Sequence, residues 1–174
     1  MSPDALAAVR TRSRGVRIAP PSASVRNLLT FSCQTQDVDR SDEQVAHEDG
    51  LALFIEPMWR SRFRESLGNE RRRRKLVGQL DHFRHLDMRY ATRILSRQQD
   101  AQKLAATLRR GGASDRCWVM SSDEAVDCRA LKLRDALAAI DGGEFGTFIS
   151  CVPGRLAYFH GEEIDERYVL ERHE

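Results

Sequence analysis

The sequence predicts an α/β fold, in which an N-terminal helical hairpin precedes a mixed sheet of order β-α-β-α-β-β-β that ends in an antiparallel meander. Apolar residues recur at helical spacing over residues 56–86, and strand-like and helix-like segments alternate from residue 88. Helices placed between strands favour right-handed parallel crossovers. The final stretch, up to residue 171, has short strands separated by turns, which favours antiparallel pairing.

Ordered structure is predicted to begin near residue 51. Residues 1–50 contain three prolines and show no sustained helical or strand period, so they are predicted to form a weakly structured leader. Their arginine-rich, acid-poor start is typical of a transit peptide, and an upstream extension from start-codon choice explains it equally well. The remainder, residues 51–174, is predicted to be a single mixed α/β domain.

The helical hairpin is predicted over residues 56–86. Pro57 suits the first position of a helix, because its missing N–H would have no partner there. One face of this first helix carries residues that recur every fourth position: Trp59, Phe63 and Leu67. Gly68 ends the helix, and Asn69 is predicted to cap the second one. The buried stripe of that second helix consists of Leu76, Val77, Leu80 and Phe83.

The sheet portion is predicted over residues 88–171. Residues 88–94 alternate as a half-buried strand would, and Ser96 and Gln99 match a capping box that begins the next helix. A buried strand at 117–120, a polar loop at 121–127 and a helix at 133–140 follow. Pro153 and Gly154 suit the central positions of a type II turn between the strands 147–152 and 156–159. A last strand is predicted at 168–170.

Charge is distributed unevenly along the chain, although the net charge is only +2. Residues 51–99 contain twelve basic and five acidic residues, a balance of +7, whereas residues 100–174 have a balance of −4. Such an asymmetry indicates either an external polyanion or pairing between the two parts. Arginine outnumbers lysine 25 to 3, which suits bidentate binding of phosphate or carboxylate, although a biased source genome gives the same ratio.

The strongest functional signal is the run from Arg71 to Lys75 in the first turns of the second predicted helix. Cations at a helix N-terminus meet the positive end of the macrodipole, so helix formation does not explain them. Free backbone N–H groups and guanidinium groups together make an anion site. The predicted anion-binding residues are Arg60, Arg64, Arg71, Arg72, Arg74 and Lys75. Arg73 is expected closer to the buried stripe, and internal pairing with acidic residues is the competing interpretation.

A second hypothesis concerns His82 and His85. Three residues apart on a helix, the two imidazoles would share a face and could hold a divalent metal, as a small metal-assisted hydrolase requires. The spacing differs from the H-E-x-x-H motif, and neighbouring Asp81 and Asp87 make an ordinary charged surface the favoured interpretation. No metal or other cofactor is therefore predicted.

Two further patterns indicate chemistry only weakly. The hydroxyls and carboxylates of the predicted loop 121–127 could hold a small polar ligand beyond a strand end, although helix capping explains them better. A Cys151 and His160 pair could form a nucleophilic site, but register across the Pro153–Gly154 turn places His160 well along the neighbouring strand. Burial of Cys151 in a strand core is the preferred explanation.

These observations favour a noncatalytic cytoplasmic binding module whose arginine-rich hairpin binds an anionic partner, either nucleic acid or an acidic protein surface. No apolar run approaches the length of a membrane span, so no membrane partner is expected. The alternatives are a protein interaction module that docks through its C-terminal strands, and the hydrolase based on the two histidines. The oligomeric state and the biological process have no signal in the sequence.

Overall fold

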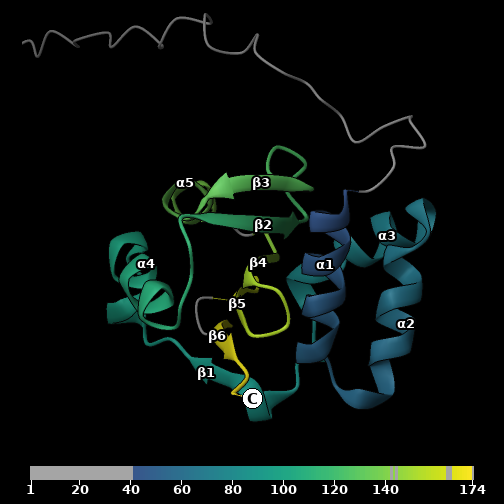
Figure 1. Ribbon diagram of the computed structural model, residues 1–174, viewed down its shortest axis with the longest axis horizontal. Helices are drawn as coiled ribbons and strands as arrows, with labels where there is room; N and C mark the ends of the chain where they lie inside the picture. Colours follow the sequence, from purple (N-terminus) through teal and green to yellow (C-terminus); the bar gives the residue numbers. More distant parts are fainter. Residues whose placement is uncertain (1–40, 142, 144, 164–165, 174) are drawn as a thin grey trace, which may run out of the picture. The chain divides into compact units, whose positions relative to one another are not determined.

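One six-stranded sheet organises the fold, and helices cover both of its faces (Figure 1). The computed structural model of the protein describes residues 41–141, 143, 145–163 and 166–173. The strands are β1 (Ala91–Arg93), β2 (Arg116–Ser121), β3 (Arg129–Lys132), β4 (Thr147–Val152), β5 (Leu156–His160) and β6 (Arg167–Glu171). Their spatial order is β1-β6-β5-β4-β2-β3, and every neighbouring pair is antiparallel.

The α/β class is confirmed, but the prediction of a mixed sheet is wrong. Strand β2 lies between β3 and β4 and runs antiparallel to both, so the helix between β3 and β4 joins two strands of the same direction that are not neighbours. The connection from β1 to β2 likewise joins two strands that run in the same direction, and β6, β5 and β4 lie between them in the sheet. The predicted crossover from β1 to β2 thus has the expected direction but does not join neighbours. The predicted crossover from 117–120 to 147–152 is wrong in direction, because β3, which the sequence pattern did not reveal, reverses the chain between β2 and β4.

The helices precede or interrupt the sheet. They are α1 (Asp42–Leu51), α2 (Pro57–Leu67), α3 (Glu70–Val77), α4 (Ala101–Arg110) and α5 (Leu133–Ile140), with short 3-10 turns η1 (Ala52–Phe54), η2 (Leu80–His82), η3 (Met88–Tyr90) and η4 (Ser96–Gln98). Helix α1 includes the last residues of the predicted leader, so ordered structure begins before residue 51. Residues 1–40 of that leader lie outside the described part of the chain.

The predicted helical hairpin is present as α2 and α3. Pro57 begins α2, and the Asn69 side chain accepts a hydrogen bond of 3.0 Å from the Arg72 N–H, so it caps α3 as expected. The second helix is shorter than predicted because Gly78 closes it, after which the chain continues through η2 into extended backbone at Phe83. This early end determines where the two histidines lie.

Residues 88–99 also differ from the prediction. The Asp87 carboxylate accepts a hydrogen bond from the Arg89 N–H and starts a 3-10 turn, which leaves three residues for β1. The expected capping box at Ser96 is a separate 3-10 turn, and Asp100 caps α4 instead by accepting from the N–H groups of residues 102 and 103. Asp100 is the better N-cap residue at this position, because its carboxylate accepts hydrogen bonds from two free N–H groups of the helix.

The sheet separates two hydrophobic cores. Alternate side chains of the inner strands point to opposite faces, so Ile149 and Tyr158 pack with α4 and α5, whereas Phe148 and Phe159 pack with α1, α2 and α3. Figure 1 shows these two helical layers on either side of the strands. The predicted turn at Pro153–Gly154 joins β4 and β5, and Gly154 has a φ of +69°.

Candidate anion-binding site

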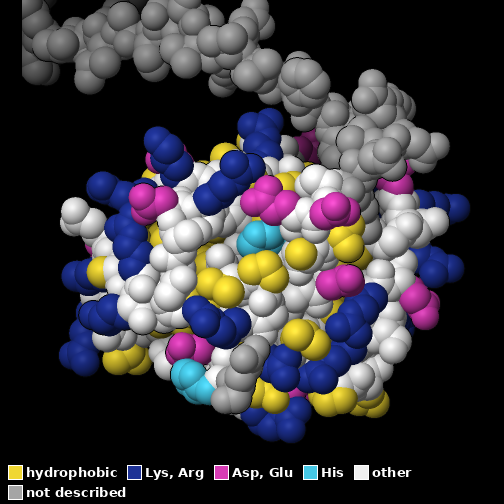
Figure 2. Space-filling model, in the orientation of Figure 1, with side chains coloured by type: hydrophobic (Ala, Val, Ile, Leu, Met, Phe, Trp, Pro, Cys, Tyr) yellow, Lys and Arg dark blue, Asp and Glu magenta, His cyan; other side chains and the backbone are white. Residues whose placement is uncertain are grey.

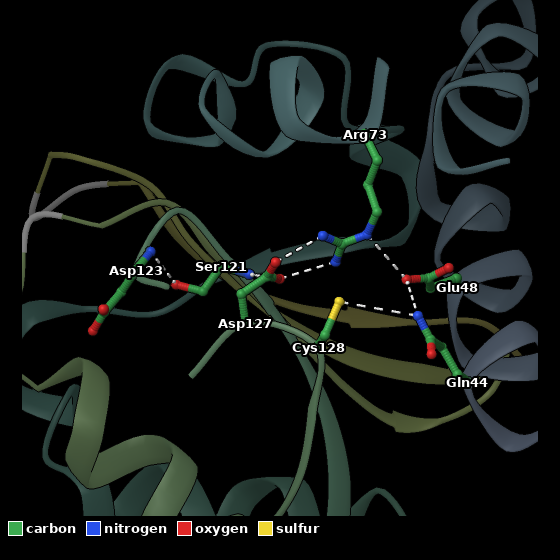
Figure 3. Close-up of polar contacts among 7 residues, drawn as sticks. All are labelled: Gln44, Glu48, Arg73, Ser121, Asp123, Asp127 and Cys128. Carbon is green, nitrogen blue, oxygen red and sulfur yellow. Dashed lines mark hydrogen bonds and ion pairs between the residues drawn. The ribbon is translucent and has the colours of Figure 1, made fainter. Parts of the chain in front are cut away.

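The arginine run on α3 divides between the interior and the surface. Arg73 is 9% exposed, and its guanidinium forms a bidentate ion pair with Asp127, with Nη1–Oδ2 and Nη2–Oδ1 distances of 2.7 and 2.9 Å. Its Nε lies 3.4 Å from Glu48 of α1. Figure 3 shows Arg73 between the Asp127 and Glu48 side chains. Burial disfavours the charged form, but hydrogen bonding to Asp127 and its charge outweigh this cost and raise the pKa of Arg73.

The interior position of Arg73 confirms the expectation that it lies near the buried stripe. Asp127 also accepts a 3.0 Å hydrogen bond from the Ser121 N–H, so one carboxylate fastens α3 to both ends of the β2–β3 loop. That loop joins two strands, not a strand and a helix as predicted. The acidic C-terminal part therefore supplies the internal partner of one arginine of the run.

The other cations of the run are exposed. Arg74 pairs with Glu70 one turn away, and Arg72 lies 3.8 Å from Glu65. Arg71 and Lys75 form no ion pair within the described residues. Figure 2 shows Lys and Arg side chains projecting on the side of the molecule where α2 and α3 lie.

The two predicted arginines of α2 have different surroundings. Arg60 donates to the backbone carbonyls of Ile55 and Leu53 at 2.8 and 3.2 Å and lies 3.3 Å from Asp87, so its guanidinium ties α2 to the segment before it. Arg64 is half exposed and lies 3.9 Å from Asp49. Arg60 is thus engaged inside the fold, whereas Arg64 remains accessible.

A pocket of about 890 Å³ lies between α2, α3 and the segment 78–85. Its apolar wall has three aromatic rings and two aliphatic side chains: Ile55, Trp59, Phe63, Leu76 and Phe83. Its cationic rim contains two residues of the predicted site and two others: Arg62, Arg72, Lys75 and Arg84. Among the described lining residues, Glu65 is the single carboxylate. The pocket therefore combines apolar rings with a strong excess of positive charge.

The aromatic wall is continuous with the core of the sheet. The Trp59 and His85 rings stack with centroids 4.0 Å apart and an interplanar angle of 24°. Phe83 meets Phe63 edge-on at 6.0 Å and lies 5.7 Å from Phe148 of β4. Such contacts hold the rings in fixed orientations, so the wall is formed without a ligand.

The two histidines do not share a helical face, which corrects the geometry on which the metal hypothesis rested. The 3-10 turn ends at His82, and the extended backbone of Phe83 separates it from His85. His82 Nδ1 lies 2.8 Å from Glu162, whereas His85 Nδ1 lies 3.4 Å from Glu56. Within the described residues, no group of three His, Cys, Asp or Glu side chains gathers in a way that could hold a metal ion.

The acidic neighbours of these histidines serve the fold. Asp81 accepts hydrogen bonds from the Ser122 hydroxyl, at 2.7 Å, and from the Gly146 N–H. Asp87 is buried and pairs with Arg89 and Arg60; hydrogen bonding from Arg89 is the main cause of its lowered pKa. Asp81 thereby fixes η2, the turn that leads into Phe83 and the pocket wall.

The remaining nucleophile hypothesis meets an unfavourable register. His160 pairs with Thr147, far along the strand from Cys151, which lies at an irregularity between Ser150 and Val152. Burial raises the pKa of the Cys151 thiol and lowers that of His160 to about 4. Burial therefore favours the protonated thiol of Cys151, and His160 does not lie near enough to act as its base.

Sequence reasoning missed Arg62 and Arg84 as members of the basic rim. Arg62 lies over the Trp59 ring, 5.3 Å from its centroid, and the i, i+3 spacing of these two residues on α2 was the available signal. Arg84 lies 3.1 Å from Glu166 and reaches the rim because the chain is extended after η2. No pattern predicted that extension.

Comparison of the chain with protein-family models, curated proteins and solved structures found no match. Within the described residues, no helix has both the length and the apolar character needed to cross a membrane.

Proposed function

We propose that this protein is a noncatalytic binding module that captures an anionic, phosphate-bearing partner at the pocket between α2 and α3, with nucleic acid as the leading candidate. The observation that supports it is the cationic rim around this pocket. Four basic side chains face one carboxylate among the described lining residues. Guanidinium groups bind phosphate through paired hydrogen bonds, and Lys75 adds a compact charge.

Three of these cations have weak partners or none, whereas Arg84 is held at 3.1 Å by Glu166, whose side chain is 18% exposed. Arg72 and Glu65 are 64% and 68% exposed and 3.8 Å apart, and exposed pairs of this kind contribute little to stability. Lys75 and Arg62 have no ion pair within the described residues. A phosphate group can therefore bind Arg62, Arg72 and Lys75 by replacing water and weak surface contacts. At Arg73 it would have to break the nearly buried ion pair with Asp127.

The alternative of docking through the C-terminal strands has less support. Strand β6 is paired with β5 on one side and β1 on the other, so its edge is not available to another chain. The sheet edges are instead β1 and β3. The hydrolase alternative required His82 and His85 to share one face of a helix, and the two residues do not lie on one helix.

A salt titration with matched variants tests the proposal. The double variant Arg72→Ala, Lys75→Ala should weaken binding to single-stranded or duplex oligonucleotides. Each cation removed from a phosphate should also reduce the slope of log K against log salt by about 0.7 to 0.9. Fluorescence anisotropy between low and physiological salt measures both effects. The fold should be unchanged, because both side chains are exposed.

The matched control is Lys132→Ala, Arg134→Ala. It removes the same charge from exposed positions where β3 ends and α5 begins, and α5 belongs to the helical layer on the other face of the sheet. Binding that is absent at low salt, or that falls equally in both double variants, would show that the pocket rim is not the site.

A further inference from the structure

The pocket offers two different chemistries side by side. Its rim supplies cations at Arg72 and Lys75, and its wall supplies ring faces and edges at Trp59 and Phe83. A ligand that carries charge alone, such as a sulfated polysaccharide or a polyglutamate chain, would satisfy the rim and leave the aromatic wall in water. A ligand with both a flat ring and neighbouring phosphates would satisfy both.

Duplex nucleic acid fits this combination poorly. Its bases are stacked inside the helix, and its accessible surface is phosphate and sugar with base edges in the grooves. An unpaired strand exposes the faces of its bases, and aromatic side chains bind those faces without regard to sequence. The volume of about 890 Å³ falls within the range of pockets that hold small organic ligands, so it suits one or two nucleotides and not a helix.

We infer that the pocket takes an unpaired base of a single-stranded nucleic acid against the wall formed by Trp59 and Phe83, while the adjoining phosphates lie on Arg62, Arg72 and Lys75. This inference rests on the proposed function and names its ligand. Trp59 is the main stacking residue. His85, stacked on it at 4.0 Å, orients the indole. The exposed Arg62 guanidinium lies over the ring, so a base that stacks there displaces it from the ring towards the adjoining phosphate.

The test compares polyanions that differ in whether they expose unpaired bases. A short single-stranded oligonucleotide should bind more tightly than a duplex of the same sequence by about tenfold or more, and its binding should quench Trp59 fluorescence. Trp118, the other tryptophan, is 7% exposed in β2 and should contribute a constant signal. Dextran sulfate and polyglutamate should bind more weakly and leave the emission unchanged.

Variants of α2 separate stacking from charge. Trp59→Leu should weaken single-strand binding between about 5-fold and 150-fold, the range expected when one base no longer stacks, with little effect on dextran sulfate. Trp59→Phe should restore most of the affinity because a ring is again present. Met58→Leu is the neighbouring control, since Met58 is 82% exposed and absent from the pocket lining. Thermal melts of each variant establish that the fold is retained.

The outcomes distinguish this inference from the proposed function. Equal binding of single strand and duplex, or wild-type affinity in Trp59→Leu, would overturn the inference while a rim-dependent polyanion site would stand. Tighter binding of polyglutamate than of the oligonucleotide would overturn it in favour of an acidic protein surface. If no polyanion binds at low salt, the proposed function fails and the inference fails with it.

Discussion

Arg71 and Arg73 are two residues apart on one helix, yet their side chains have opposite surroundings. Arg71 is exposed and forms no ion pair within the described residues, whereas Arg73 is buried between Asp127 and Glu48. Successive positions on a helix differ by about 100° in direction, so a run of identical residues cannot have one role. The cluster combines a structural cation with accessible ones.

Substitution of these two arginines should separate the roles. Arg73→Ala removes the cation that the nearly buried Asp127 and Glu48 carboxylates share, and it should lower the free energy of unfolding by about 3 to 5 kcal/mol. Arg71→Ala should change it by less than about 0.5 kcal/mol, as is usual at the surface. Urea unfolding followed by circular dichroism measures both. Equal effects of the two substitutions would contradict the assigned roles.

At the scale of elements, the short turn η2 carries the pocket wall without being part of a regular helix. Asp81 fastens it to the β2–β3 loop through Ser122 and to the start of β4 through Gly146. Gly146 allows this approach, because a Cβ there would lie 2.1 Å from the backbone carbon of Leu80. The position of Phe83 thus depends on contacts with the sheet and its loop and not on local helix propensity.

Loss of this attachment should affect both stability and binding. Asp81→Ala removes the acceptor of two hydrogen bonds and should destabilise the protein by about 1.5 to 3 kcal/mol. It should also weaken oligonucleotide binding, although it removes a negative charge. Asp123→Ala is the control, since it removes the same charge from a residue whose carboxylate accepts one local hydrogen bond from Ala125. Binding that strengthens equally in both variants would show that charge, not the turn, controls affinity.

Most elements could be predicted from the sequence, and the errors have identifiable causes. Pro57, Asn69 and Gly154 mark their boundaries correctly because each acts within a few residues. The mixed sheet was wrong because β3 has four residues, three of them half-buried, and lacks a clear alternation. The pocket could be predicted only in part, since Arg72 and Lys75 belong to a visible cluster whereas Arg84 reaches the rim through the early helix end at Gly78.

At the scale of the whole molecule, a buried histidine links stability to pH. Burial is the main cause of the lowered pKa of His160, the charge of Arg167 adds to it, and the result is about 4 instead of 6.5. Between these values the unfolded chain binds a proton that the folded chain does not, so stability falls as pH decreases from about 6.5 to about 4. His47, whose pKa is also lowered by burial, acts in the same direction.

The variant His160→Gln should reduce this dependence. Glutamine does not titrate, so the variant takes up one proton fewer when it unfolds. The slope of the unfolding free energy against pH should therefore fall by up to about 1.4 kcal/mol per pH unit between the two pKa values. Urea unfolding at several pH values measures the slope. His173→Gln, at a position whose side chain is 84% exposed, should leave it unchanged. An unaltered slope in His160→Gln would mean that the folded protein protonates this imidazole.

The pairing of β1 with β6 has a consequence for the order of folding. Ala91 lies opposite Leu170, so the edge strand β1 finds its partner only after the four strands that separate β1 from β6 in the sequence have been made. The nested hairpin of β4 and β5 can close first, because its strands are adjacent in sequence. Contacts of such long sequence separation slow folding, since the loop entropy is lost before the contact forms. Until β6 arrives, the nascent domain exposes the edge of β5.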